Sequence, residues 1–178
     1  MFQIPFTITD EDYLAFSRYH MSHTPSGRKL LVRLRLIAPV IGVFALFLLL
    51  LAGARPLLLW AEAVTITLLS LLLLPLAPRI MLGSIRRQLA RMGKEGHLPY
   101  TPEGELQFGE DFLLEITPGT ETRISYSRIE RIGVTPEALY LYSGTAQAYI
   151  LPFSALADAD MKERLLAFVQ QKTGLSFS

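Results

Sequence analysis

Two long apolar segments joined by a short turn constrain this chain more than any other feature of its sequence. Leu36–Ala54 contains no charged residue, and Leu57–Pro78 contains only Glu62. As an α-helix each segment would span roughly 28–33 Å, which matches the hydrocarbon thickness of a bilayer. The sequence therefore predicts a transmembrane hairpin within residues 25–96. The alternative is a buried hairpin of a soluble protein, which the scarcity of polar residues disfavours.

Basic residues gather at the two outer ends of the hairpin, whereas its turn holds only Arg55. Before the first apolar segment they are Arg28, Lys29, Arg33 and Arg35. After the second they are Arg79, Arg86, Arg87, Arg91 and Lys94. The positive-inside rule then predicts a multi-pass protein with both termini in the cytoplasm. Juxtamembrane basic residues also attract anionic lipid, so we expect membrane lipids as partners unless these residues only set the topology. The candidate lipid contacts are Arg28, Lys29, Arg86, Arg87, Arg91 and Lys94.

Small residues recur at helical spacing along both apolar segments. Small side chains let two helix backbones approach closely, which favours helix association where lipid removes the hydrophobic driving force. The predicted packing residues are Ala38, Gly42, Ala45, Ala63, Thr67 and Ser70. Antiparallel pairing is expected to bring Ala45 near Ser70 and Ala52 near Ala63.

The composition excludes several kinds of site. The chain has no cysteine, which excludes disulfides and thiol chemistry, and its net charge of +1 provides no field that would attract nucleic acid. His20 and His23 have a spacing that could hold a metal, but packing is preferred because no third ligand accompanies them. A structural or interfacial role is preferred over transport for Glu62. No catalytic motif is recognisable, so we expect a non-enzymatic protein without catalytic residues, cofactor or metal.

The segments outside the hairpin predict a small α+β domain. Phe2–Ile8 alternates as a strand, and a helix capped by Thr9 runs on to His23. The strands expected after the hairpin are 105–108, 112–117, 122–127, 129–135, 138–143 and 146–152. Met81–Met92 is expected to form a basic helix, and Asp158–Lys172 an amphipathic helix that closes the sheet.

The N-terminal strand needs a surface to cover it, because a lone apolar strand is unstable. The predicted topology puts residues 1–24 and 97–178 on the same side of the membrane. We expect them to form one cytoplasmic domain, with the strand at a sheet edge and near the closing helix around Leu165 and Phe168. In the alternative, Tyr13–His23 lies on the membrane as an interfacial helix. The expected fold class is a membrane α+β protein, in which a two-helix transmembrane hairpin carries a small antiparallel-sheet domain.

Five short stretches of the sequence are similar to stretches of a known family. They are Phe6–Tyr13, Phe16–His20, Ser125–Ile132, Leu139–Tyr142 and Ala148–Phe153. Together with the order of the parts, they resemble the YcxB-like family of bacterial membrane proteins. The resemblance implies a C-terminal module of pleckstrin-homology-like type and a location in the bacterial inner membrane. It implies no catalytic residues.

These observations lead to two functional hypotheses. The first is a non-enzymatic inner-membrane protein whose cytoplasmic domain binds a lipid headgroup, a peptide or a protein partner. The second is an accessory subunit of a transporter or envelope complex, which contacts its partners through the transmembrane hairpin. The expected partners besides lipid are another membrane protein or further copies of the same chain. A membrane protein that copurifies in stoichiometric amount would favour the second hypothesis.

Overall fold

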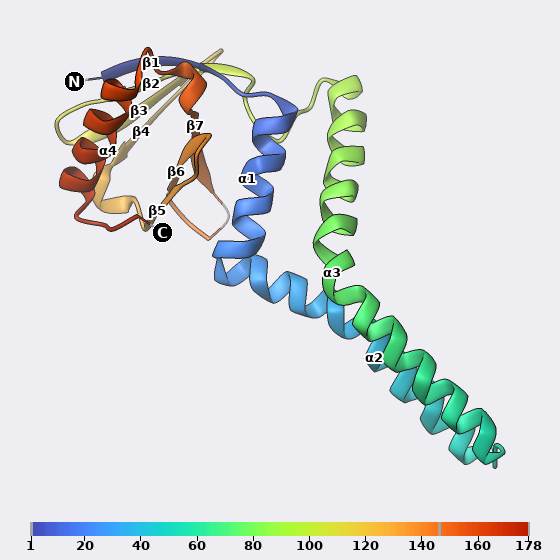
Figure 1. Ribbon diagram of the computed structural model, residues 1–178. Coiled ribbons are helices and arrows are strands. Elements are labelled where there is room, and N and C mark those ends of the chain that lie inside the picture. The colour runs from blue at the N-terminus through green and yellow to red at the C-terminus, as the bar shows by residue number, and fades with distance from the viewer. Residues whose placement is uncertain (1, 146, 178) are drawn as a thin grey trace. The chain divides into compact units, whose positions relative to one another are not determined.

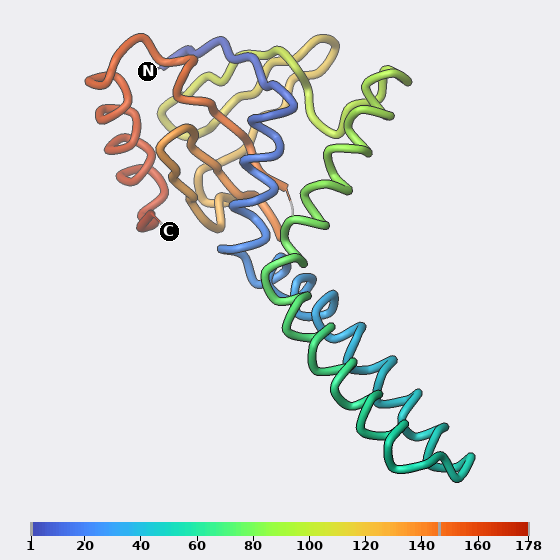
Figure 2. Tube along the Cα trace, turned by 45° about the vertical axis from the view of Figure 1, so that its right-hand side comes forward, coloured from blue at the N-terminus to red at the C-terminus, as the bar shows by residue number. Residues whose placement is uncertain are grey.

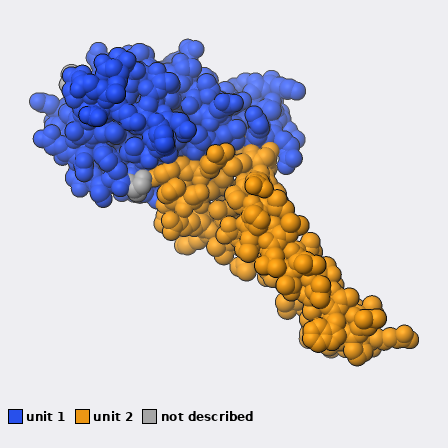
Figure 3. Space-filling model, in the orientation of Figure 1, with its two compact units in different colours: residues 1–17, 86–178 blue, residues 18–85 orange. Residues whose placement is uncertain are grey.

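The computed structural model describes residues 2–145 and 147–177, which form two compact units (Figures 1 and 3). The first unit combines residues 1–17 with residues 86–178, and the second unit is Arg18–Ile85. Ala146, where the sixth predicted strand was expected to begin, lies outside the described residues, as do both terminal residues.

The first unit contains two antiparallel sheets (Figure 1). One has the strand order β1-β2-β3-β4, with strands Phe2–Thr7, Glu103–Phe108, Phe112–Thr117 and Thr120–Ser125. The other has the order β5-β6-β7, with strands Arg131–Val134, Ala138–Tyr142 and Ala148–Pro152. The 3₁₀ helices η1 (Tyr126–Arg128) and η2 (Phe153–Ala155) follow β4 and β7, and helix α4 (Ala159–Thr173) comes last. The predicted antiparallel sheet structure with a closing C-terminal helix is therefore confirmed.

Local turn chemistry explains why β4 differs from the predicted strand at both ends. It begins at Thr120 because a two-residue turn, Pro118–Gly119, connects it to β3. Gly119 has φ +86°, which glycine adopts without the steric strain of a side chain. The strand ends at Ser125, whose hydroxyl accepts a backbone hydrogen bond from η1 and so starts a helical turn.

Strand β1 precedes both long helices of the chain, yet it pairs with β2, which follows them. Ile4 lies opposite Leu106 in an antiparallel register, and Phe6 lies opposite Gly104. Ile4, Phe6 and Leu106 are buried, so the alternation of the N-terminal segment puts its apolar side in the core. A Cβ at position 104 would lie 2.8 Å from the Phe6 ring, which explains the glycine there. Segments on either side of the helices thus form one sheet.

Helix α4 packs against the sheet that contains β1. Asp158 caps its first turn, and Gly174, with φ +68°, caps its end. Leu165 is fully buried in the core. The Phe168 ring contacts the Phe2 ring at a centroid distance of 5.6 Å. The closing helix therefore contacts the N-terminal strand directly.

Both faces of the central strand β6 are buried. Leu139 and Leu141 lie on one face, and Tyr140 and Tyr142 lie on the other, which is covered by Phe16 from the first half of helix α1 (Asp10–His23). The Phe16 ring lies 5.4 Å from the Tyr140 ring and 6.0 Å from the Tyr142 ring. The start of α1 is thus part of the core of the first unit.

The second unit is built from helix α2 (Pro25–Leu51) and from helix α3 (Pro56–Glu95) as far as Ile85, and the two helices lie side by side (Figures 1 and 2). Their most apolar windows have mean hydropathies of 2.6 and 2.2, and 6% and 0% of these windows are buried. Both helices are therefore long and apolar enough to cross a membrane. Their exposure is not that of core helices in a soluble protein.

Helix α3 runs without a break from the second apolar segment through the basic helix that the sequence predicted over Met81–Met92, and it ends at Glu95. Pro78 lies inside it and has no N–H to donate to the carbonyl of Leu74, four residues earlier. Nη2 of Arg35, on α2, donates a hydrogen bond to that carbonyl at 3.1 Å. A side chain from the neighbouring helix thus satisfies the backbone group that the proline leaves free.

The two helices pair in a different register from the predicted one. Gly42 faces Ile66, whose side chain occupies the space that a Cβ at position 42 would need. In an antiparallel pair, three residues further along α2 correspond to three residues back along α3, so Ala45 lies beside Ala63 rather than beside Ser70. The four-residue connection between Leu51 and Pro56 sets this register, because residues equally far from the turn face one another.

One of the predicted packing residues does not lie on the packed side. Thr67 is exposed, and its hydroxyl donates a hydrogen bond to the Ala63 carbonyl of its own helix at 2.9 Å. Ala52, predicted to pair with Ala63, is also exposed, because α2 ends one residue before it. The predicted residues that are less than fully exposed are Ala38, Gly42, Ala45, Ala63 and Ser70.

Candidate functional site

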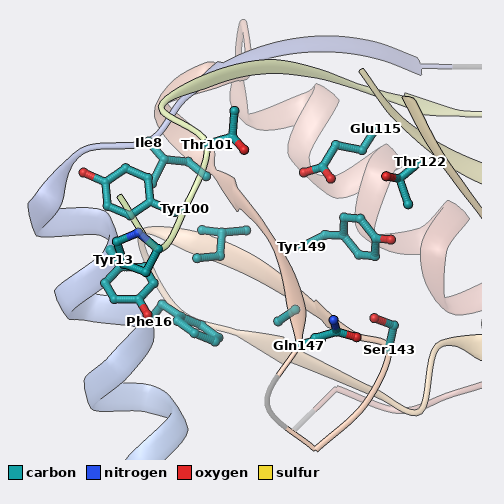
Figure 4. A pocket seen from close by; sticks show the side chains of 13 residues that line it. Ile8, Tyr13, Phe16, Tyr100, Thr101, Glu115, Thr122, Ser143, Gln147 and Tyr149 are labelled. Atoms are coloured by element: carbon teal, nitrogen blue, oxygen red, sulfur yellow. The ribbon is translucent and has the colours of Figure 1, made fainter. Parts of the chain in front are cut away.

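A pocket of about 440 Å³ lies in the first unit (Figure 4). Its volume falls within the range of about 300–1,000 Å³ that is usual for small-molecule sites. Its lining comes from α1, from the segment before β2, from β3 and β4, and from β7 with the loop that precedes it. Figure 4 shows an aromatic end around Tyr13, Tyr100 and Phe16 and a polar end around Glu115 and Thr122.

The polar end arises where the core-facing rows of the two sheets change from apolar to polar residues. In the first sheet, Leu113 and Ile124 are paired and buried, and the next pair on the same face is Glu115 and Thr122. In the second sheet, Tyr149 is paired with Leu141 on the buried leucine face of β6. A carboxylate in a core-facing row breaks the local rule for a buried strand, and such exceptions are expected at functional sites.

Glu115 has no compensating partner among its neighbours. It is half-buried, and no hydrogen bond or ion pair reaches its carboxylate within residues 2–145 and 147–177. Burial raises the pKa of Glu115 above its ordinary value, because the charged form loses hydration. Burial and the Glu115 charge also raise the pKa of Tyr149, and the nearby Arg128 opposes this effect. The pocket therefore holds a carboxylate with little local compensation.

The aromatic end is held together by the start of α1. The rings of Tyr13 and Tyr100 stack at 5.2 Å, and the Tyr100 hydroxyl donates a hydrogen bond to Asp10 Oδ1 at 2.7 Å. Burial and this bond to an anion raise the pKa of Tyr100 to about 12. Thr9 and Asp12 cap the helix reciprocally through side-chain bonds to each other's N–H, as expected for Thr9 at the N-cap. The capped helix start thus positions the aromatic wall.

Ser143 lines the pocket, but no histidine does so within the described part of the chain. His20 and His23 face different groups: a ring nitrogen of His20 lies 3.2 Å from the Ser26 hydroxyl, and His23 stacks on Tyr19 at 4.4 Å. The described residues contain no group of three His, Cys, Asp or Glu that could hold a metal.

The predicted lipid-contact residues fall into two separately described groups. Four are exposed on the last turns of α3 in the first unit: Arg86, Arg87, Arg91 and Lys94. At about 100° per residue, Arg87, Arg91 and Lys94 share the side of the helix opposite Leu89, which is 2% exposed, whereas Arg86 lies about 60° from Leu89 around the helix. Arg28 and Lys29 are exposed in the second unit, and Nε of Arg28 donates a hydrogen bond to the Ser22 carbonyl at 2.8 Å.

Sequence reasoning missed the pocket. Glu115 and Tyr149 stood within predicted strands, and Tyr13 stood within the predicted N-terminal helix. The local pattern did not mark Glu115, because Phe112, Leu114 and Ile116 form the apolar side of the strand and Glu115 lies on the alternate side with Thr117. Its counterparts on β7 and α1 could not be found from the local pattern either, because they are brought together by tertiary structure.

The fold and the pocket define an α+β protein with two antiparallel sheets, a ligand-sized cavity and two long apolar helices. Residues 108–169 match the family model described as YcxB-like protein. The match begins at the last residue of β2 and ends within α4, and it confirms the resemblance inferred from the sequence for this part of the chain. No curated protein and no solved structure matches the chain.

Proposed function

We propose that this chain is a bacterial inner-membrane protein whose cytoplasmic domain is a non-enzymatic binding module. The observation that carries the proposal is the pocket with an uncompensated carboxylate, in a chain that also exposes two long apolar helices. The seven strands in two sheets with a terminal helix support a pleckstrin-homology-like type for the domain. Function is argued from the pocket, because one fold type hosts many functions.

The hairpin is proposed to cross the membrane with both termini inside. Its support is the exposure of the apolar windows and the excess of basic residues at the outer ends of the hairpin. Reporter fusions at Thr24 and Ser178 should both indicate cytoplasm, and a tag between Gly53 and Pro56 should be external. A periplasmic signal from the Ser178 fusion would contradict this topology.

The end of α3 is proposed to lie beyond the hydrocarbon, with its basic side available to anionic headgroups. A helix of 40 residues is about 60 Å long, roughly twice the hydrocarbon thickness. Basic residues near an anionic surface contribute about 1 kcal/mol each. Binding to liposomes that contain phosphatidylglycerol should therefore weaken when Arg87 and Arg91 are replaced by glutamine.

The second candidate function is an accessory subunit that contacts a transporter or envelope complex through the hairpin. It is favoured by the exposed Trp60 and leucines of α2 and α3, which would be available to another membrane protein as well as to lipid.

A photoreactive phenylalanine analogue can replace either Tyr149 in the pocket or Trp60 in the hairpin of the full chain. Ligand or partner adducts at position 149 support the binding module. Stoichiometric protein adducts at position 60, with none at position 149, support the accessory subunit.

A further inference from the structure

The charge of the pocket is negative. Glu115 is the one charged residue that lines it within the described part of the chain. At the aromatic end, Asp10 and Asp12 lie close enough to Tyr100 to raise its pKa. At the polar end, the nearby Arg128 acts on Tyr149 against the effect of Glu115. An anionic ligand would therefore meet like charge in this pocket, whereas a cation would meet opposite charge.

Two of the arginines on the sheets contact aromatic rings outside the pocket lining. The guanidinium of Arg123, on β4, lies 3.5 Å from the centre of the Phe112 ring. The guanidinium of Arg131, on β5, lies 4.5 Å from the centre of the Tyr142 ring. Neither residue lines the pocket. The Glu115 carboxylate is thus left without an internal ion pair, although the neighbouring strand carries an arginine.

The walls of the pocket are rich in aromatic rings. Tyr13, Phe16, Tyr100 and Tyr149 all line it. Aromatic rings attract ammonium and guanidinium groups through the negative potential of their faces, and the attraction grows when the site is partly desolvated. A half-buried carboxylate beside the Tyr149 ring, in a pocket whose other end is aromatic, is therefore a suitable environment for an organic cation.

We propose that the pocket binds an organic cation, an ammonium or a guanidinium group, with the Glu115 carboxylate as its counter-ion and the Tyr149 ring beside it. This inference rests on the proposed binding module and names the class of its ligand. The same chemistry can come from a free small molecule or from a lysine or arginine side chain of a partner. A phosphate-bearing headgroup is not the ligand of this pocket, so any contact with anionic lipid occurs elsewhere on the chain.

The experiment titrates three small-molecule probes into the purified full chain in mild detergent. Calorimetry and ligand-observed NMR measure the binding of each probe. Choline represents a free cation, Nα-acetyl-arginine methylamide represents a side chain, and glycerol 3-phosphate represents an anionic headgroup. The cationic probes should bind and glycerol 3-phosphate should not. Choline binding more tightly would indicate a free small molecule, and the arginine derivative binding more tightly would indicate a side chain.

Two variants of nearly identical shape test the role of the carboxylate. Glu115→Gln removes the charge in the pocket and should weaken binding of the cationic probes by about tenfold or more. Glu121→Gln removes an exposed charge from the adjacent strand and should change the affinity by less than about twofold. Circular dichroism of both variants identifies any loss of fold.

Three results would overturn the inference: no binding of the cationic probes, tighter binding of glycerol 3-phosphate, or equal affinities of the two variants. None of these results bears on the binding module itself. Photocrosslinking from position 149 would still detect a ligand of another class. The failure of one proposal can therefore be distinguished from the failure of the other.

Discussion

Replacement of Ile4 by alanine should destabilise the whole first unit, although Ile4 is far from the rest of that unit in sequence. Ile4 is 1% exposed, and the change removes three buried carbons and leaves a cavity. The expected cost is about 3 kcal/mol, within the usual range of about 2–5 kcal/mol for such a substitution. For a domain of roughly 100 residues this lowers the melting temperature by about 12–24 °C.

The control is Gln3→Ala, because Gln3 is the exposed neighbour on the opposite face of the same strand. It should change the stability by no more than about 0.5 kcal/mol. Thermal unfolding followed by circular dichroism in mild detergent measures the difference. Hydrogen exchange over residues 103–108 should rise in the Ile4 variant, because β2 is the strand that pairs with β1. Equal melting temperatures and unchanged exchange in β2 would refute the argument that β1 is part of this core.

Three further predictions concern the hairpin and the pocket. Cysteines that replace Ala45 and Ala63 should form a disulfide in this cysteine-free chain. In the control, the cysteine on α3 replaces Ser70 instead of Ala63. This moves it by about 10 Å along the helix and should prevent the bond. Arg35→Met should lower the thermal stability of the hairpin by about 1–3 kcal/mol, because a carbonyl loses its donor. A second change, Pro78→Ala, should restore it in melting experiments. Because burial raises the pKa of Glu115, the folded state binds its proton more tightly than the unfolded state, so stability falls as the pH rises above about 4.5. Glu115→Gln should reduce that fall in melts from pH 4 to 8; an unchanged slope would contradict the assignment.

The elements with strong local patterns could be predicted from the sequence. The apolar runs of α2 and α3, the strands of the two sheets and the capped helix after Asp158 all follow from hydrophobic periodicity and turn residues. The continuation of the second apolar segment as a basic helix was also expected, although Pro78 inside α3 weakens a helix locally. The donor that compensates for it, Arg35, lies on another helix and is not visible in the local pattern.

The site depended on information that local patterns do not contain. Glu115 lies on the polar side of an alternating strand as the sequence presents it, and Tyr149 and Tyr13 have no local feature that marks them. They line one pocket because separate segments of the chain meet there. The register of the hairpin was missed for a related reason. Small residues indicate which sides can pack, but the length of the turn decides which residues face each other.

The pairing of β1 with β2 has a consequence for the order of events during synthesis. Ile4 is made first, but its partner Leu106 emerges only after both apolar helices, about 5–20 s later at a translation rate of about 5–20 residues per second. The core of the first unit cannot close before then.

The hairpin brings distant parts of its own chain together, since Met21 and Ala77 share one buried cluster. A helix pair that forms early would shorten the effective loop between the two strands and reduce its closure entropy. Folding of the domain would then depend on prior assembly of the hairpin.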